Sequence, residues 1–265
     1  MESTLEEVEF LVRSPNRVDV LRLLAEDHQT RNELAAETDA SQATLGRILT
    51  DFQERSWVRQ LGAEYVATGT GRLVASGMSD LLQIIETERE LRGIVEYLPT
   101  HAMDFDLRHL ADATVVTPSQ TRPDAPVSRV VDLLGVGSDV TVFSHAFNHQ
   151  SLAAVHERVT AGEQTFRGVF SEDAVEALAD DATLTGYLVD LLDAEDAALR
   201  VRTEDIPIAV TTVDDVVHVI LRDDSGVLQA SLDTDDDAVR SWARDTFDYY
   251  WRTADPLKRG DLDSR

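Results

Sequence analysis

The residues with the clearest chemical potential lie within residues 41–60, and the chemistry they suit is hydrogen bonding to nucleic-acid bases. Gln42, Ala43, Thr44 and Arg47 combine short side chains with hydrogen-bonding ones. Side chains of these types reach base edges in the major groove of DNA, where each base pair presents a distinct pattern of donors and acceptors. We therefore predict that Gln42, Thr44 and Arg47 read bases.

Further polar residues around this segment are predicted to contact the DNA backbone, since phosphate contacts set the position of a DNA-binding protein. The remaining members of the predicted DNA-binding set are Arg31, Ser41, Arg59 and Gln60.

A helix is needed to present these side chains. Ser41 has the character of a helix N-cap, because its hydroxyl can accept a hydrogen bond from a free backbone N–H. After it, four apolar residues recur at helical spacing and define the buried face: Leu45, Ile48, Leu49 and Phe52. A short helix is predicted before it, over residues 31–38. Two helices joined by a tight turn predict a helix-turn-helix.

Beyond Trp57 the hydrophobic period changes from helical to alternating. Residues 58–61 and 65–68 read as strands joined by a turn at residues 62–64. A hairpin directly after such a helix predicts a wing, with Arg59 and Gln60 reaching phosphate or the minor groove. The alternative is that Tyr65 and Val66 simply pack the hairpin on the helices.

Charge distinguishes this segment, since the whole chain carries a net charge of −26. Proteins that bind DNA are usually basic. Within residues 41–60, however, three arginines, at positions 47, 55 and 59, face only two carboxylates. We interpret this near-neutral island as the nucleic-acid face. The alternative is that the arginines pair with neighbouring carboxylates.

Composition indicates a folded cytoplasmic protein from a cell with molar salt. The chain is acidic throughout and Lys258 is its only lysine. At molar salt the Debye length is about 3 Å, which screens self-repulsion. Cysteine is absent, which excludes disulfides and fits a reducing compartment. We expect neither a signal peptide nor a membrane helix.

The pattern of elements predicts four segments. They are a winged helix-turn-helix domain (1–69), a connecting and dimerisation helix (70–99), an α/β domain (100–254) and a flexible tail (255–265). The connecting helix is too apolar to stand alone in water, so it is expected to pack on a second copy of the chain or on the α/β domain. Alternating strands and helices from residue 102 predict an α/β sandwich with a mainly parallel sheet.

A second group of polar residues is predicted to form an effector pocket. In open α/β sheets, ligands bind beyond the carboxyl ends of the strands. This rule indicates two sets of residues that follow predicted strands: Thr117, Ser119 and Arg122, and Ser144, His145 and His149. Ordinary polar loops are the alternative, and a metal site on His145 and His149 is disfavoured because further ligands are missing. No cofactor is predicted.

Three stretches resemble the archaeal transcriptional regulators that carry the middle domain of the methanogenesis regulator FilR, especially those of halophilic archaea. They are SQATLGRILTDFQERSWV (41–58), YVATGTGRLVA (65–75) and VVHVILRDDSGVLQASLDTDDDAVRSWARDTFDYYW (216–251). The resemblance extends over nearly the whole chain. One departure is Ser56, where glycine is expected in the turn that leaves the recognition helix.

The resemblance implies a DNA-binding transcription regulator whose C-terminal domain senses a small-molecule or protein effector. It also implies a phospholipase D-like sandwich for that domain. The enzymatic version of the sandwich needs paired histidine and lysine residues, so the resemblance implies a catalytically inactive domain here.

From these observations we predict a homodimeric regulator of double-stranded DNA, with no enzymatic activity. Two alternatives stay open: an adaptor whose winged helix binds protein, and a hydrolase that uses His145 as nucleophile or base.

Overall fold

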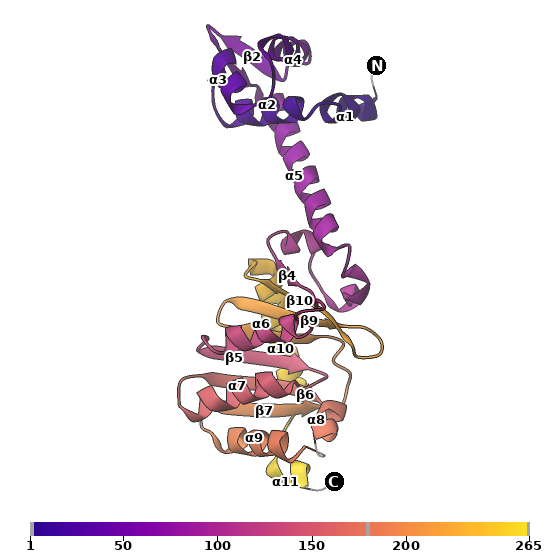
Figure 1. The fold of residues 1–265 in the computed structure, drawn as a ribbon, viewed down its shortest axis with the longest axis vertical. Coiled ribbons are helices and arrows are strands. Elements are labelled where there is room, and N and C mark those ends of the chain that lie inside the picture. Colours follow the sequence, from indigo (N-terminus) through magenta and orange to yellow (C-terminus); the bar gives the residue numbers. More distant parts are fainter. Residues whose placement is uncertain (1–2, 179–180, 264–265) are drawn as a thin grey trace. The chain divides into compact units, whose positions relative to one another are not determined.

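A computed structural model describes residues 3–178 and 181–263 of the chain (Figure 1). The chain divides into two compact units, Met1–Glu86 and Thr87–Arg265. Helices and a small sheet make up the first unit, and a large sheet covered by helices makes up the second. The fold class is therefore mixed α/β.

The first unit is a helical cluster with a three-stranded antiparallel sheet in the order β1-β3-β2. Its elements are α1 (Thr4–Val12), α2 (Pro15–Glu26), β1 (Gln29–Thr30), α3 (Arg31–Glu37), α4 (Gln42–Glu54), β2 (Val58–Leu61), β3 (Glu64–Ala67) and the first part of α5 (Gly69–Leu91).

Helix α4 anchors this unit through the apolar face that its periodicity predicts. Leu45, Ile48, Leu49 and Phe52 are all at most 3% exposed. Burying a side chain of this size stabilises a fold by about 1.5–3 kcal/mol, so this one face holds α4 firmly against its neighbours. Its opposite face is thereby fixed towards solvent.

Helix α5 is shorter than the predicted helix over residues 70–99, since it ends at Leu91 and is followed by a turn and the short 3₁₀ helix Val95–Tyr97. Gly93 lies in that turn, and glycine disfavours helix by about 1 kcal/mol relative to alanine. Turning the chain here also buries Ile94 and Leu98 in the core of the second unit.

The second unit is built on an eight-stranded sheet in the order β11-β7-β6-β5-β8-β9-β10-β4. The strands are β4 (Thr114–Val116), β5 (Asp139–Ser144), β6 (Thr165–Ser171), β7 (Ala197–Arg202), β8 (Ala209–Val213), β9 (Val216–Arg222), β10 (Leu228–Thr234) and β11 (Asp255–Pro256).

The expectation of a mainly parallel sheet is wrong. Only the β5–β6 and β6–β7 pairs are parallel, and the other five pairs are antiparallel. Parallel neighbours need a crossover connection, usually a helix, whereas short loops join antiparallel neighbours. The tight turns after β8 and β9 therefore impose antiparallel pairing on half of the sheet.

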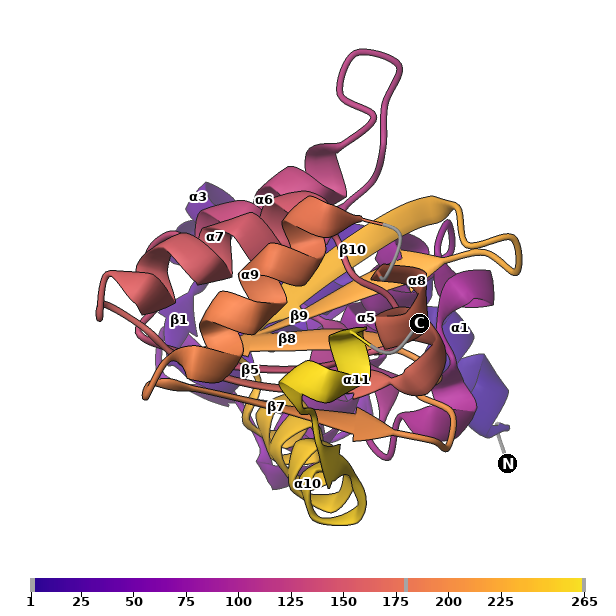
Figure 2. The ribbon, with the colours of Figure 1, turned by 90° about the horizontal axis from the view of Figure 1, so that it is seen from below.

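Helices cover both faces of this sheet (Figure 2). Helix α10 (Asp237–Thr253) packs on one face, and the apolar cluster beneath it includes Phe143, Val219, Trp242 and Phe247. The opposite face carries α6 (Ala125–Leu134), α7 (His149–Thr160) and α9 (Ala182–Asp193), with α8 (Glu172–Leu178) between β6 and α9. The sheet is thus the central layer of three.

The end of the chain is ordered where the sequence predicts a flexible tail from residue 255. Strand β11 pairs antiparallel with β7, and α11 (Arg259–Asp263) follows it. Leu257 and Leu262 are buried in the cluster under α9, and burial of these two apolar side chains holds the segment in place. Residues 264–265 lie outside the described part of the chain.

Candidate nucleic-acid interface

Helix α4 begins as the sequence predicts. Ser41 is its N-cap in extended conformation, and its hydroxyl accepts a hydrogen bond from the backbone N–H of Thr44 at 3.2 Å. The hydroxyls of Ser41 and Thr44 also lie 2.9 Å apart. Ser41 therefore fixes the first turn of α4, the turn that carries most of the predicted base-reading residues.

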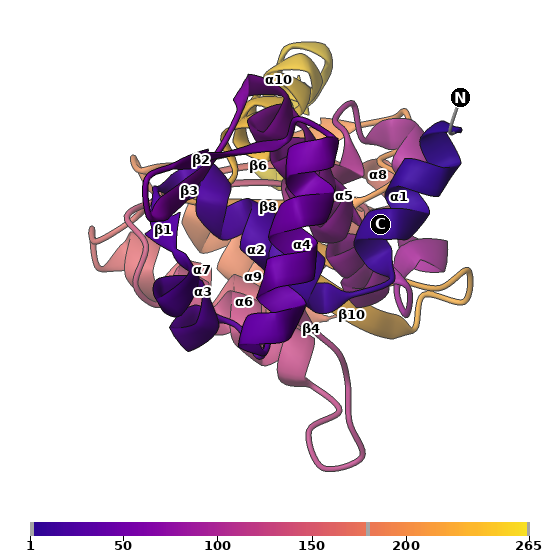
Figure 3. The same cartoon turned by 90° about the horizontal axis from the view of Figure 1, so that it is seen from above.

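The outer face of α4 is polar and open. Gln42, Ala43 and Arg47 are exposed and Thr44 is half-buried. Figure 3 shows α4 with α3 beside it. Between the two helices, Nε2 of Gln42 donates a hydrogen bond to Oδ1 of Asn32 at 3.2 Å. Sequence reasoning did not identify Asn32, because no local pattern links it to α4.

Arg31 also lies against α4. A Cβ atom placed on Gly46 would stand 3.6 Å from Nη2 of Arg31, so the guanidinium lies over the backbone of α4 at this glycine. Arg31 is exposed and comes from the first residue of α3. The guanidinium of Arg31 therefore belongs to the same surface as Gln42 and Arg47.

Four of the eight arginines of the first unit are paired with carboxylates. Arg17 bonds Asp51 at 3.2 Å, and Arg55 bonds Glu7 at 2.8 Å while lying over the ring of Phe10. For Arg55, the alternative raised in the sequence analysis is therefore correct. The charge of Arg55 is balanced by Glu7, and the charge of Asp51 is balanced by Arg17.

The other four arginines of this unit, Arg31, Arg47, Arg59 and Arg72, are exposed and have no carboxylate within ion-pair distance among the described residues. Arg72 donates a hydrogen bond from Nη1 to the carbonyl of Ala67 at 2.9 Å. Arg31, Arg47 and Arg59 are the three that belong to α3, α4 and the hairpin. The sequence predicts a surface with Arg47, Arg55 and Arg59. In the structure the arginines without carboxylate partners on α3, α4 and the hairpin are Arg31, Arg47 and Arg59.

The β2–β3 hairpin follows α4, with Gly62 at φ 67° in its turn. Arg59 and Gln60 are exposed, but the amide of Gln60 donates to the carbonyl of Gly62 at 2.8 Å. Gln60 is therefore engaged in the turn itself. Tyr65 and Val66, on the partner strand, are buried, so the hairpin both packs on the helices and exposes Arg59.

Helix α4 ends in a Schellman motif. The N–H of Ser56 bonds to the carbonyl of Gln53 at 3.0 Å and the N–H of Trp57 to that of Phe52 at 2.9 Å. Ser56 has φ 59°, the left-handed conformation that usually requires glycine. Ser56 therefore occupies a position whose backbone conformation favours glycine.

Replacing Ser56 by glycine is expected to stabilise the first unit by about 0.5 kcal/mol. The left-handed conformation costs a non-glycine residue about 1–2 kcal/mol, and the greater freedom of glycine in the unfolded chain offsets part of the gain. The urea midpoint of unfolding should rise for Ser56→Gly and not for Ser56→Ala. Equal midpoints for the two variants would show that the turn is unstrained.

The six predicted effector residues do not form one pocket. Thr117, Ser119 and Arg122 belong to the loop after β4, the edge strand, which is separated from β5 by three strands. In Figure 2 the loop between β4 and α6 stands out from the rest of the second unit. Ser144 and His145 follow β5, so the two sets are separated by the antiparallel half of the sheet.

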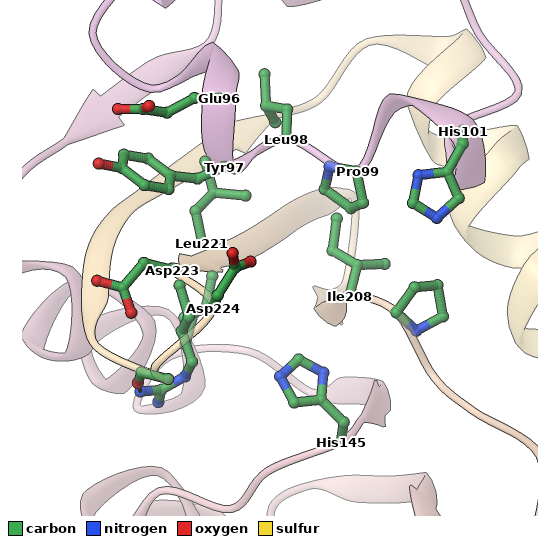
Figure 4. A pocket seen from close by; sticks show the side chains of 14 residues that line it. Glu96, Tyr97, Leu98, Pro99, His101, His145, Ile208, Leu221, Asp223 and Asp224 are labelled. Atoms are coloured by element: carbon green, nitrogen blue, oxygen red, sulfur yellow. Dashed lines mark hydrogen bonds between the residues drawn. The ribbon is translucent and has the colours of Figure 1, made fainter.

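The second set is itself divided. Ser144 is buried in a turn with Ala146 and lines a small cavity of about 70 Å³ between α6 and α7. His145 lines a different cavity of about 660 Å³ (Figure 4). His149 is exposed at the start of α7, with its ring edge-on to Tyr187 at 6.2 Å.

His145 is half-buried, and its surroundings shift its pKa. Burial lowers the pKa of its ring, the backbone of Ile206 raises it in part, and the positive charge of Arg222 lowers it further. A neutral imidazole can donate or accept a hydrogen bond. In the described residues, no group of three or more histidine, cysteine, aspartate or glutamate side chains is arranged to hold a metal ion. Nor does any helix there have the length and apolar character to cross a membrane.

The fold and these surfaces define a two-domain α/β protein that presents an arginine-bearing helix from a small N-terminal domain. Family models give it a more specific place: residues 5–90 match the HVO_A0261 N-terminal domain, and residues 123–253 match the middle domain of the methanogenesis regulatory protein FilR1. Residues 5–90 and 123–253 therefore carry these two domains, in agreement with the sequence resemblance to regulators with a FilR middle domain. The first match includes almost all of α5.

Comparison with solved structures gives distant likenesses. One is TrmBL2, described as an archaeal chromatin protein with a novel mode of DNA binding, at 13% identity and a TM-score of 0.44, covering 96% of this chain and 100% of that one. Another is Nuc, a phospholipase D family member from Salmonella typhimurium, at 11% identity and a TM-score of 0.43, covering 55% of this chain and 99% of that one. NucT from Helicobacter pylori scores 0.40 at 9% identity, covering 55% and 98%. These TM-scores lie below 0.5, too low to carry a functional argument. No curated protein matches by sequence.

Proposed function

We propose that this protein is a transcription regulator whose N-terminal winged helix-turn-helix binds double-stranded DNA in a sequence-specific manner. The observation that carries the proposal is the surface formed by α3, α4 and the β2–β3 hairpin. It presents Arg31, Arg47 and Arg59, each exposed and without a carboxylate partner among the described residues.

The overall charge gives this surface its significance. The chain has a net charge of −26, and four arginines of the same unit, Arg13, Arg17, Arg22 and Arg55, are paired with carboxylates. A guanidinium group without a carboxylate partner can still bind phosphate or guanine, both of which accept bidentate hydrogen bonds from arginine.

In the proposed complex the first turns of α4 enter the major groove. Gln42 and Arg47 contact base edges. Thr44 is half-buried, and its methyl or hydroxyl group contacts the DNA at the edge of this interface. Ser41 acts mainly as the helix cap. Arg31, which lies over α4 at Gly46, and Arg59, on the hairpin, bind the phosphate backbone. Gln60 is partly occupied by its bond to Gly62.

Arg47→Ala is expected to weaken binding to the specific site by about 5–150-fold, the equivalent of about 1–3 kcal/mol for one bidentate arginine–guanine pair. Binding to random DNA should change much less, because one phosphate contact contributes little at high salt. Fluorescence anisotropy with upstream DNA of the gene itself and with random DNA, in potassium-rich buffer, measures both affinities.

The matched control for this experiment is Arg13→Ala, which removes an exposed arginine that is paired with Glu9 on α1. It should leave both affinities unchanged. Equal losses on the two DNAs for Arg47→Ala would contradict base reading by this residue. No binding of the wild-type protein to any upstream fragment would favour the adaptor hypothesis, in which the same surface binds protein.

We further propose that the regulator is a homodimer formed through α5. Leu81, Leu82, Ile84 and Ile85 are 40–46% exposed and lie within two turns of one helix. A contiguous apolar patch of this kind is typical of an interaction surface. A two-fold dimer would match a pseudo-palindromic DNA site, with one recognition helix for each half-site.

The double variant Leu81→Glu/Ile85→Glu is expected to convert the dimer to a monomer, because it places charge in the apolar patch. Analytical ultracentrifugation measures the mass. Leu5→Glu, which changes a 78% exposed leucine of α1, is the control and should remain dimeric. A double variant that stays dimeric would exclude α5 as the interface. A monomeric wild type would exclude the dimer altogether.

A further inference from the structure

A side-chain hydrogen bond joins the two helices of the candidate interface. Nε2 of Gln42, the first residue of α4, donates to Oδ1 of Asn32, the second residue of α3, at 3.2 Å. Both helices are anchored in the core of the first unit, since Leu34 of α3 and Leu45 of α4 are completely buried. The bond therefore connects two side chains whose backbones are already fixed.

The side chain of Gln42 retains hydrogen-bonding capacity beyond this bond. A glutamine carboxamide has one carbonyl oxygen that accepts and two N–H groups that donate. One N–H is used by Asn32, and within residues 3–178 and 181–263 neither Oε1 nor the second N–H of Gln42 has another partner. Because Gln42 is exposed, this acceptor and this donor are open to a ligand.

Among the four bases, adenine matches the remaining acceptor and donor of Gln42. In the major groove adenine presents the N7 acceptor and the N6 amino donor, which together bond to one carboxamide. Guanine presents two acceptors, N7 and O6, so Oε1 of Gln42 would face an oxygen. Thymine offers O4 and a methyl group, and cytosine offers only its amino group, so each leaves one group of Gln42 without a partner.

The bond to Asn32 also fixes the orientation of the Gln42 carboxamide. Turning the carboxamide over places Oε1 against Oδ1 of Asn32, and two acceptors repel each other unless Asn32 turns as well. The amino group of Asn32, which has no partner within the described ranges, is the part that DNA attracts, because phosphate oxygens only accept hydrogen bonds. Phosphate therefore favours the orientation in which Oδ1 of Asn32 faces Gln42.

Arg31 independently supports this arrangement of α3 against α4. Its guanidinium lies over α4 at Gly46, with Nη2 3.6 Å from the position of a Cβ atom there. Gly46 is four residues after Gln42 and so lies on the same face of α4. The first two residues of α3 thus lie along the face of α4 that carries Gln42, and both can donate to the phosphates that border a groove.

We propose that Gln42 reads an adenine in the major groove and that Asn32 is a positioning residue that orients its carboxamide. Oε1 of Gln42 accepts a hydrogen bond from N6 of the adenine, and its free N–H donates to N7. Asn32 contacts no base, and its amino group donates to phosphate. The proposal rests on the DNA-binding function proposed above and names the base that the start of α4 recognises.

Selection from a library of duplexes with a random central segment, followed by sequencing, tests the proposal on the full chain. Wild type should enrich a site with an adenine for which Gln42→Ala has lost the preference. The discrimination between adenine and guanine at this position should fall by about 5–150-fold, the range for one bidentate contact to a base. Gln53→Ala, an exposed glutamine near the end of the same helix, is the matched control and should select the wild-type site.

Base analogues in the selected duplex test the two hydrogen bonds separately. 7-Deazaadenine lacks the N7 acceptor, and unsubstituted purine lacks the N6 amino group. Each should weaken wild-type binding by about 2–10-fold, the usual contribution of one hydrogen bond. Neither should change the affinity of Gln42→Ala, because that variant no longer contacts the base. Fluorescence anisotropy measures these affinities.

Two variants of Asn32 separate positioning from a purely structural role. Asn32→Ala should lower the preference for adenine over guanine at this position. Asn32→Asp should keep the preference, because aspartate retains an oxygen that accepts from Gln42. Asn32→Asp should also weaken binding to selected and random DNA alike, since it adds a negative charge beside phosphate. Thermal unfolding checks that both variants are folded.

Adenine reading is overturned if Gln42→Ala selects the same bases as wild type, if the preference that it loses is for another base, or if wild type binds both analogues as tightly as adenine. The positioning role is overturned if Asn32→Ala keeps the wild-type preference or Asn32→Asp loses it. These outcomes leave the DNA-binding function intact, since they require a selected site. Enrichment of no site by wild type overturns both that function and this proposal.

Discussion

Gly71→Ala is expected to destabilise the first unit by about 3 kcal/mol or more, at or above the upper end of the usual cost of overpacking. Gly71 is buried in the first turn of α5, where a Cβ atom would lie 1.9 Å from the carbonyl oxygen and 2.8 Å from the carbonyl carbon of Trp57. That carbonyl accepts a bond from the N–H of Thr68 at 2.8 Å. The obstacle is backbone at the junction of α4 and β2, so a side-chain rotation cannot relieve it.

The same substitution should also reduce the proposed DNA binding, because Trp57 connects α4 to the hairpin that carries Arg59. Hydrogen exchange of peptides from α4, measured in parallel with urea unfolding, reports stability in this unit alone. Gly77→Ala is the matched control on the same helix, since a Cβ there meets nothing within 4 Å. It should stabilise α5 by up to about 1 kcal/mol. Similar effects from both variants would mean that α5 does not approach Trp57 this closely.

Asp233→Asn is expected to cost the second unit about 3 kcal/mol. The carboxylate of Asp233 is 4% exposed, lies 2.5 Å from Nδ1 of His218 and bonds Nε of Arg129. Removing one partner of a buried ion pair typically costs about 3–5 kcal/mol. We expect a value near about 3 kcal/mol here, because Arg129 is half-exposed and water can solvate its charge in the variant. Thermal unfolding measures the loss. Asp235→Asn, at an exposed carboxylate two residues further on, should be close to neutral.

The pH dependence of this effect has a definite sign. Burial alone would raise the pKa of Asp233, but hydrogen bonds from His218 and Arg129 outweigh it and hold the pKa below the usual 3.8. A carboxyl group whose pKa is lower in the folded state contributes stability above its unfolded pKa and loses it as the pH falls through the folded value. The stability difference between wild type and Asp233→Asn should therefore be constant from pH 7 to about 5 and shrink below about pH 4. A difference that grows on acidification would contradict this pairing.

The candidate interface was largely predictable because its causes are local. The apolar spacing of α4, the N-cap at Ser41 and the glycine turn at Gly62 act over three or four residues, and each is found where the pattern indicates. The membership of the positive surface was less predictable. Arg55 is paired with Glu7, 48 positions away, and Arg31 joins the surface across the packing of α3 on α4.

The effector pocket was predicted from a rule about strand ends without knowledge of strand order. Thr117 follows β4 and Ser144 ends β5, but β8, β9 and β10 lie between those two strands. The cavity beside His145 depends instead on residues such as Glu96 and Arg222, which no motif links to the histidine.

The sequence by itself therefore determined α3, α4 and the β2–β3 hairpin of the first unit and which face of α4 is polar. These properties follow from periodicity and capping, which involve near neighbours along the chain. Only the tertiary structure decided which arginines are left without carboxylates, how eight strands are ordered and which walls meet in the 660 Å³ cavity. Those outcomes depend on pairing between segments far apart in sequence, where many arrangements bury similar apolar area and only the packed fold distinguishes them.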